Sequence, residues 1–233
     1  MPTSAAVRSP ADLRLMPFGQ TDPKKVRDGL WEPLWRGRRV LIDILDGRVT
    51  IRDEHNEPAD GFESLREALV AACLADEVVL DGYLMPGPLS DGGGADSLPG
   101  MDAMLSASEM SRQLILGGGG SRRDRREEFS EGRGPRVQLP PSSPIAFVAV
   151  DLLWMDGEPI IDVPLLERKR QLDAVLVDGP DVRRTVAVRP PVEAWFAQWR
   201  ALGFREIAVK SANSRYTPGK PNGEWATTFI PKG

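Results

Sequence analysis

The sequence predicts a protein of mixed α+β class, and three local patterns support this. Two strand candidates, residues 39–45 and 48–52, flank an Asp-Gly pair, which is a signal for a two-residue hairpin. Residues 62–74 carry apolar side chains at helical spacing. Residues 145–154 form a continuous apolar run, which is typical of a strand covered on both faces. Strands and helices therefore alternate along one chain.

The remaining elements follow from the same patterns. Further strands are predicted at residues 77–85, 185–188, 207–210 and 225–230, and further helices at residues 164–177 and 191–202. Gly203 is expected to end the last of these helices.

The domain organisation follows from two stretches of different composition. Residues 1–22 mix Pro, Ser and Ala and predict a loosely ordered arm, whose few apolar residues could pin it to the domain surface. Residues 86–144 hold runs of Gly and a cluster of charges, and such a segment buries too little to offset its ordering entropy. We interpret it as a flexible insertion within one domain, residues 23–233. A linker between two domains is the alternative, but each flank is small and open-edged.

Composition excludes several classes of function. Lys and Arg number 30 against 34 Asp and Glu, a net charge of −4, which argues against an autonomous DNA-binding domain. Cys73 and His55 are the only residues of their types, so an intrachain disulfide, a His-based triad and a multi-His metal site are excluded. No apolar run reaches the length of a membrane span. The sequence predicts a cytoplasmic protein.

Five short segments carry a resemblance to a known family, in the family's order. They are Glu32-Pro33-Leu34-Trp35-Arg36-Gly37-Arg38-Arg39, then Leu80-Asp81-Gly82-Tyr83, residues 150–157 with 164–168, residues 205–210 with 214–219, and residues 225–229. Together they resemble the adenylation domain of ATP-dependent DNA ligases, within the covalent nucleotidyltransferase superfamily. The resemblance implies two antiparallel β-sheets flanked by helices, a nucleotidyltransferase (ATP-grasp-like) fold. It also implies ATP and Mg²⁺ as cofactors and work in DNA repair or recombination.

The departures from the family bear on its chemistry. The family's first segment contains the lysine that attacks the α-phosphate of ATP, and Leu34 stands in its place. Leucine has no lone pair, and the neighbouring Arg36 and Arg38 stay protonated, so none of them is a nucleophile. Tyr83 and Arg205 replace family glutamates that would hold Mg²⁺ or the ribose. We therefore predict no catalytic residue and no metal site.

The residues that survive suggest a remnant of a nucleotide site. By resemblance, Glu32 would face the adenine, Arg39 would contact the ribose or a phosphate, and Lys210 would reach the α-phosphate. Each also has a plain structural interpretation, as a surface carboxylate, a strand-end ion pair and a solvent-facing lysine. Asp151 lies between apolar residues and needs a partner if buried, and Arg168 is the candidate for a structural pair.

Further family features are missing. Thr227 and Phe229 replace the terminal lysines that would neutralise phosphates. The chain stops at Gly233, where a family ligase continues into an OB-fold domain, so no OB-fold domain is expected.

These observations predict a degenerate homologue, a pseudoenzyme that does not self-adenylate. One alternative is a non-catalytic scaffold that binds ATP, DNA or a DNA-repair protein. The other is an active DNA ligase whose lysine comes from elsewhere, such as Lys24 or Lys25, although these lie well upstream of Leu34. The sequence leaves the oligomeric state open.

Overall fold

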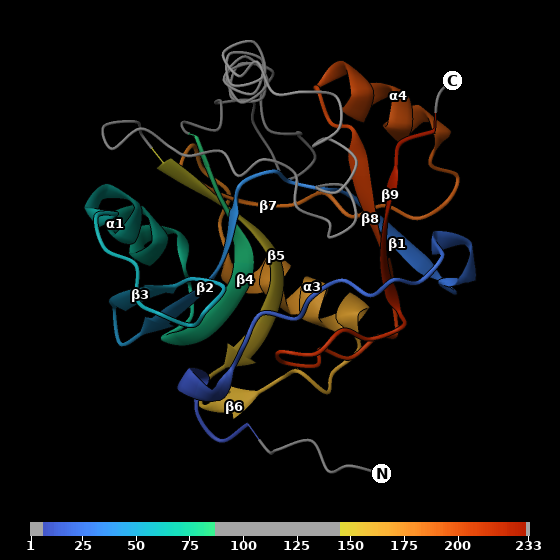
Figure 1. The fold of residues 1–233 in the computed structure, drawn as a ribbon. Helices are drawn as coiled ribbons and strands as arrows, with labels where there is room; N and C mark the ends of the chain where they lie inside the picture. The colour runs from blue at the N-terminus through green and yellow to red at the C-terminus, as the bar shows by residue number, and fades with distance from the viewer. Residues whose placement is uncertain (1–6, 87–144, 232–233) are drawn as a thin grey trace, which may run out of the picture.

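The computed structural model describes residues 7–86 and 145–231 and contains two β-sheets. The larger sheet has the order β3 (Arg48–Arg52), β2 (Arg38–Leu45), β4 (Glu77–Pro86), β5 (Ile145–Met155) and β6 (Glu158–Pro159), with β7 (Val182–Arg184) beside β5. The smaller sheet has the order β1 (Gly29–Pro33), β8 (Glu206–Ser211) and β9 (Trp225–Phe229) (Figure 1). All these pairings are antiparallel except that of β5 with β7. The predicted α+β class with two antiparallel sheets is confirmed.

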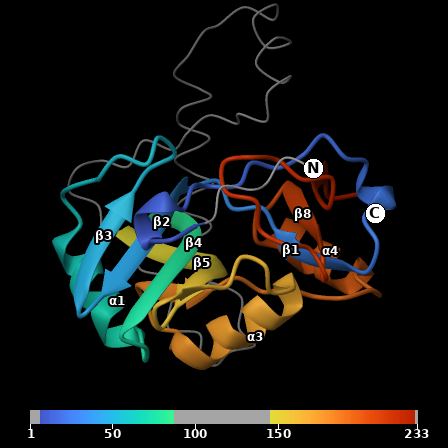
Figure 2. The same ribbon diagram turned by 90° about the horizontal axis from the view of Figure 1, so that it is seen from below.

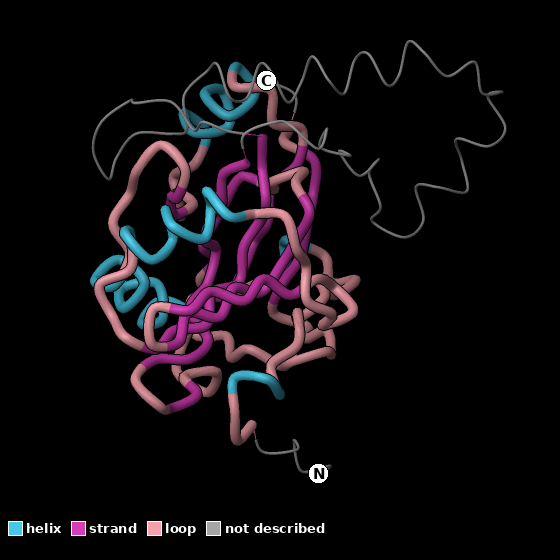
Figure 3. The backbone as a smooth tube through the Cα atoms, turned by 90° about the vertical axis from the view of Figure 1, so that its left-hand side faces the viewer, coloured by secondary structure: helices cyan, strands magenta, loops and turns pink. Residues whose placement is uncertain are grey.

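Within the described residues, three α-helices and two short turns of 3₁₀ helix accompany the sheets: α1 (Glu63–Ala72), α3 (Leu165–Val175), α4 (Glu193–Ala201), η1 (Pro10–Asp12) and η2 (Pro23–Lys25). Helix α1 packs on the larger sheet, and α4 packs against the smaller one. Helix α3 lies between the two sheets in both ribbon views (Figures 1 and 2). The helices lie mostly along one side of the strands (Figure 3). Helix α3 is thus placed to send side chains toward either sheet.

The two faces of the larger sheet contribute to two different apolar cores. Side chains alternate between its faces with a period of two. Val40 and Leu80 belong to the apolar core that includes α1 and the inner residues of α3. Leu41 and Val79, one position along, belong to a core shared with the N-terminal segment and the smaller sheet. Odd-numbered residues on β2 and β4 therefore face the space between the sheets.

The structure corrects one strand and adds two. The predicted strand at residues 185–188 is wrong, because the chain pairs with β5 slightly earlier, as β7. It then leaves β5 after the Thr185 amide bonds the carbonyl of Ala149, and Val188 bridges to Trp31 instead. Strands β1 and β6 were not predicted, since both are short and end at or beside proline.

The described part of the predicted arm, residues 7–22, contacts the domain through apolar side chains. Leu13 and Met16 are fully buried in the core between the sheets. Arg52 donates to the carbonyl of Leu13 at 3.0 Å, and Arg39 donates to that of Met16 at 2.8 Å. The segment is therefore anchored through Leu13 and Met16, while Arg8, Ala11 and Arg14 are exposed.

The predicted insertion lies almost wholly at residues 87–144, outside the described residues. Strands β4 and β5, which bound it, pair with each other along their length. No helix in the described ranges is long and apolar enough to cross a bilayer.

Candidate functional site

Two of the predicted site residues meet in a buried ionic cluster, and a third residue joins them. Lys210 Nζ donates to Glu32 Oε2 at 2.8 Å. Lys169 Nζ, from α3, lies 2.7 Å from the other carboxylate oxygen, Oε1. This second contact is an ion pair held by charge, since the amine and the oxygen are not aligned for a hydrogen bond. We call Glu32, Lys169 and Lys210 the Glu32 cluster.

Strand register brings Glu32 and Lys210 together. Leu30 of β1 is opposite Lys210 of β8, and Glu32 is opposite Ala208, so the two charged residues are diagonal neighbours on one face. Trp225 of β9 lies directly opposite Lys210, and the Lys210 Nζ lies 4.4 Å from the centre of the indole ring. The aromatic face adds a favourable interaction with the ammonium.

Burial and charge set the protonation of the cluster. Burial opposes ionisation of Glu32, but the charges of Lys169 and Lys210 outweigh it and hold the pKa of Glu32 below its ordinary value. Burial lowers the pKa of Lys210, the charge of Lys169 adds to this shift, and Glu32 opposes it without cancelling it. The carboxylate is thus ionised, while one of the two amines is destabilised as a cation.

Arg39 is not part of this cluster. Its guanidinium binds Asp81 of β4 in a bidentate pair, at 2.9 Å and 2.5 Å. Tyr216 also donates to Asp81, at 3.0 Å, and accepts from the amide of Met16 at 2.8 Å. Burial opposes the charge on Arg39, but Asp81 outweighs it and raises the pKa of Arg39 well above its ordinary value. Arg39 therefore holds the sheet to the N-terminal segment.

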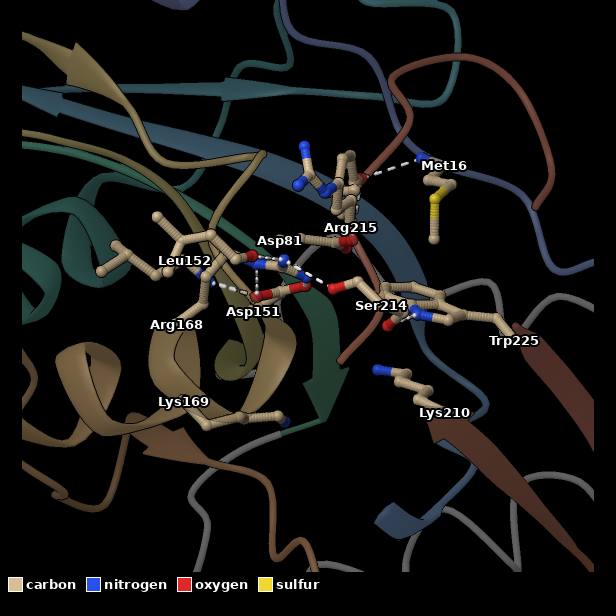
Figure 4. A network of polar contacts seen from close by, with 12 residues as sticks. Met16, Asp81, Asp151, Leu152, Arg168, Lys169, Lys210, Ser214, Arg215 and Trp225 are labelled. Carbon is tan, nitrogen blue, oxygen red and sulfur yellow. Dashed lines mark hydrogen bonds and ion pairs between the residues drawn. The ribbon is translucent and has the colours of Figure 1, made fainter. Parts of the chain in front are cut away.

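Asp151 and Arg168 form the predicted pair. Arg168 donates to both oxygens of Asp151, at 2.9 Å and 2.7 Å, and both residues are fully buried. Arg168 also bonds the carbonyl of Ser214, and the Ser214 hydroxyl accepts from the indole of Trp225 at 2.8 Å. Figure 4 shows this network beside Lys169 and Lys210. The pair connects α3 to the loop between β8 and β9.

The residues around Leu34 differ in their burial. Leu34 is half-buried just beyond β1, and its amide donates to the carbonyl of Glu206 at 3.0 Å. Trp35 is buried and its indole donates to Thr185, whereas Arg36 is exposed. A Cβ at Gly37 would come within 2.0 Å of the carbonyl oxygen of Leu84, so only glycine fits against β4.

Tyr83, which stands in place of a family glutamate, is a buried phenol. Burial raises the pKa of Tyr83 to about 12; the carboxylates of Asp81 and Glu32 add to the shift, and Arg39 opposes it. Its hydroxyl keeps its proton near neutral pH and supplies no negative charge to its surroundings.

The residues present do not fit a bound Mg²⁺ ion. Within the described ranges, no three acidic, histidine or cysteine side chains gather as a group that could hold a metal. The buried carboxylates of Glu32, Asp81 and Asp151 are each ion-paired with arginine or lysine. A metal ion would have to displace these cations to bind there. Phosphate fits better, because the cluster holds two ammonium groups.

Lys169 was missed from the sequence, although a signal was present. Lys169 follows Arg168 within a basic run, and such a run usually indicates a solvent-exposed helix face. Helical spacing nevertheless puts it on the same face as Leu165 and Leu172, four positions before it and three after. A lysine on the buried face of a helix needs a partner, and Glu32 is that partner.

Comparisons with known proteins point to DNA ligases. No protein-family model matches the chain. A DNA ligase of Methanothrix thermoacetophila is 24% identical over 226 residues, 94% of this chain and 36% of that protein. A DNA ligase of Methanoculleus marisnigri is 32% identical over 104 residues, 45% of this chain and 18% of that protein. The matched regions thus span about a third or less of these relatives.

Solved structures decide the fold. The ligase domain of Mycobacterium tuberculosis LigD matches with a TM-score of 0.60 at 21% identity, over 95% of this chain and 60% of that one. Its fold is that of an ATP-dependent DNA ligase adenylation domain. A mycobacterial DNA ligase D complexed with ATP matches this ligase-like domain with a TM-score of 0.58 at 20% identity, over 94% of this chain and 60% of that one.

Proposed function

We propose that this chain is a DNA-ligase-like adenylation domain that does not form a covalent bond to AMP. The observation that carries the proposal is Leu34. Adenylation of the protein needs an amine that attacks phosphorus, and an aliphatic side chain has none. The buried carboxylates are paired with arginine and lysine, so they are not free to hold the Mg²⁺ ion that adenylation uses in the family, and this also supports the proposal.

A nucleophile from another position has little support. Lys24 and Lys25 are exposed on η2, which packs beside β9 at the edge of the smaller sheet. Lys210 and Lys169 are buried, but both are engaged by Glu32. An attacking amine must be free and within bonding reach of the phosphate.

The likeness to LigD, a multifunctional non-homologous end joining protein in Mycolicibacterium smegmatis, supports a setting in DNA repair. We place the chain in the cytoplasm, as a domain that binds ATP or DNA without sealing nicks by itself. A scaffold that binds a DNA-repair protein is the second candidate, and the retained Glu32–Lys210 pair favours ligand binding over it.

The test is incubation of the full chain with radiolabelled ATP and Mg²⁺, followed by denaturing electrophoresis and intact mass measurement. We expect no stable protein–AMP adduct. A stoichiometric adduct on the unaltered chain would overturn the proposal.

Leu34→Lys sharpens the test. The single substitution should not restore adduct formation, because Tyr83 and Arg205 still replace the family's carboxylates. An adduct in this variant alone would show that only the nucleophile is missing. Leu74→Lys, at an exposed leucine distant in the fold on the C-terminal side of α1, is the matched control.

A further inference from the structure

We propose that Lys169 is a phosphate-binding residue, and that Lys169 and Lys210 together form a site for the phosphoryl oxygens of a nucleoside triphosphate. The assignment of a nucleotide as the ligand rests on the proposed function. The anion site itself rests on the charges and contacts of the Glu32 cluster.

The charge count points to a missing anion. Arg39 balances Asp81, and Arg168 balances Asp151, one cation to one carboxylate. The Glu32 cluster has two cations on one carboxylate, which leaves one buried positive charge uncompensated. Tyr83, the nearby phenol, stays neutral and does not balance it. A buried excess charge is costly without a counter-ion, and a bound anion would supply one.

The hydrogen-bond donors point the same way. Each ammonium group carries three N–H donors. Among the described residues, Lys210 places one on Glu32 Oε2 and faces the ring of Trp225, and Lys169 has no aligned acceptor. A phosphoryl group offers several acceptor oxygens on one centre, which suits two amines with unused donors.

The amines converge on one place. Figure 4 shows the amine ends of Lys169, from α3, and Lys210, from β8, pointing toward one another. The side chain of Lys169 is 10% exposed, whereas those of Glu32 and Lys210 are 2% exposed. Lys169 is thus the most exposed side chain of the three, although its amine nitrogen is itself buried.

The site differs from a purely structural ion pair in a testable way. Removing the charge of Lys169 leaves one lysine to one carboxylate, the ratio found at Asp81 and Asp151. If Lys169 serves an anion, its loss weakens anion binding without weakening the anion-free fold. If Lys169 is only structural, its loss weakens the fold and leaves anion binding unchanged.

The experiment titrates the full chain with inorganic tripolyphosphate, without Mg²⁺, by isothermal titration calorimetry at constant ionic strength. The unaltered chain should show saturable binding, and ATP should compete for the same site. Lys169→Met should weaken binding about tenfold or more, since each charge-assisted hydrogen bond to an anion is worth about a factor of ten. Its melting temperature without anion should equal or exceed that of the unaltered chain.

Arg170→Met is the matched control. Arg170 is the next residue on α3, carries the same charge, and has a side chain that is 67% exposed and paired with Glu167. This variant should bind tripolyphosphate as the unaltered chain does. Equal losses of tripolyphosphate affinity in Lys169→Met and Arg170→Met would show that only the net charge of the chain matters, and would overturn the proposal.

Two further outcomes would overturn all or part of this proposal. Absence of saturable tripolyphosphate binding to the unaltered chain overturns the proposal, whether or not any variant folds. Binding that a 5′-phosphorylated nicked duplex displaces and ATP does not would overturn the assignment to a nucleoside triphosphate. A protein–AMP adduct would overturn the proposed function alone, because tripolyphosphate binding does not depend on covalent chemistry.

Discussion

The buried ion pairs at Asp81 and Asp151 differ from the cluster at Glu32 in their balance of charge. Each aspartate holds one arginine through two parallel hydrogen bonds. Glu32 instead holds two lysines, each through one oxygen. Bidentate arginine pairs satisfy both partners and suit a structural role. A carboxylate shared between two amines leaves N–H donors and one positive charge unmatched, and these suit an anionic ligand.

The largest expected effect breaks a balanced pair. Arg168→Met leaves Asp151 charged and without its arginine at a fully buried site, which should cost about 4 kcal/mol of unfolding free energy. Urea denaturation at neutral pH measures this loss. Arg170→Met, on the same helix and exposed, should change stability by no more than about 0.5 kcal/mol. A similar small change in Arg168→Met would mean that the pair is not structural.

A smaller effect is expected at the unbalanced cluster. Glu32→Gln leaves two buried ammonium groups without a carboxylate and should cost about 3 kcal/mol. Tripolyphosphate should restore part of this loss, because an anion can take over as counter-ion. Denaturation curves with and without the anion measure both effects. Tripolyphosphate should not restore the stability of Arg168→Met. Equal recovery of stability in Glu32→Gln and Arg168→Met would show that the Glu32 cluster and the Asp151 pair do not differ in their need for an anion.

The hydroxyl of Tyr216 offers a finer comparison within the balanced network. Tyr216→Phe removes a donor to Asp81 and the acceptor for the Met16 amide, and should cost about 1–2 kcal/mol. Hydrogen exchange of the Met16 amide should accelerate along with the loss in stability. Unchanged protection of that amide would show that the Tyr216 hydroxyl does not help to hold the N-terminal segment.

The smallest expected effect is the pH dependence from Lys210. Its pKa in the folded chain lies below the ordinary value of 10.5, so between these two values the unfolded chain binds more protons. Stability from this group should therefore rise with pH across that window, measured as the difference between the unaltered chain and Lys210→Met. Tripolyphosphate should flatten the rise, since an anion favours the charged amine. A fall in place of the rise would contradict the lowered pKa.

Part of this site was predictable because it depends on local pattern. Asp151 among apolar residues required a cation, and Arg168 proved to be that cation. The hairpin of β2 and β3 followed from Asp46 and Gly47, whose backbones take the positive φ that this turn requires. Gly203 likewise has a positive φ at the end of α4.

Other parts depended on strand register, which sequence alone leaves undetermined. Arg39 and Asp81 are diagonal neighbours only because Arg39 is opposite Tyr83 and Leu41 is opposite Asp81. A shift of one residue would turn these side chains to opposite faces. The sequence offered Arg39 both a nucleotide contact and an ion pair, and the register places it beside Asp81.

The sequence by itself determined the chemistry that position 34 lacks, because no fold gives leucine an amine. It also determined the order of the motifs, and with them the ligase-like fold. Only the tertiary structure decided that Lys169 lies beside Glu32. Backbone hydrogen bonds from Leu165 and Leu166 to the loop after β8 hold the start of α3 against the smaller sheet. That contact between distant segments turns a lysine in a basic run toward Glu32, and no local pattern encodes it.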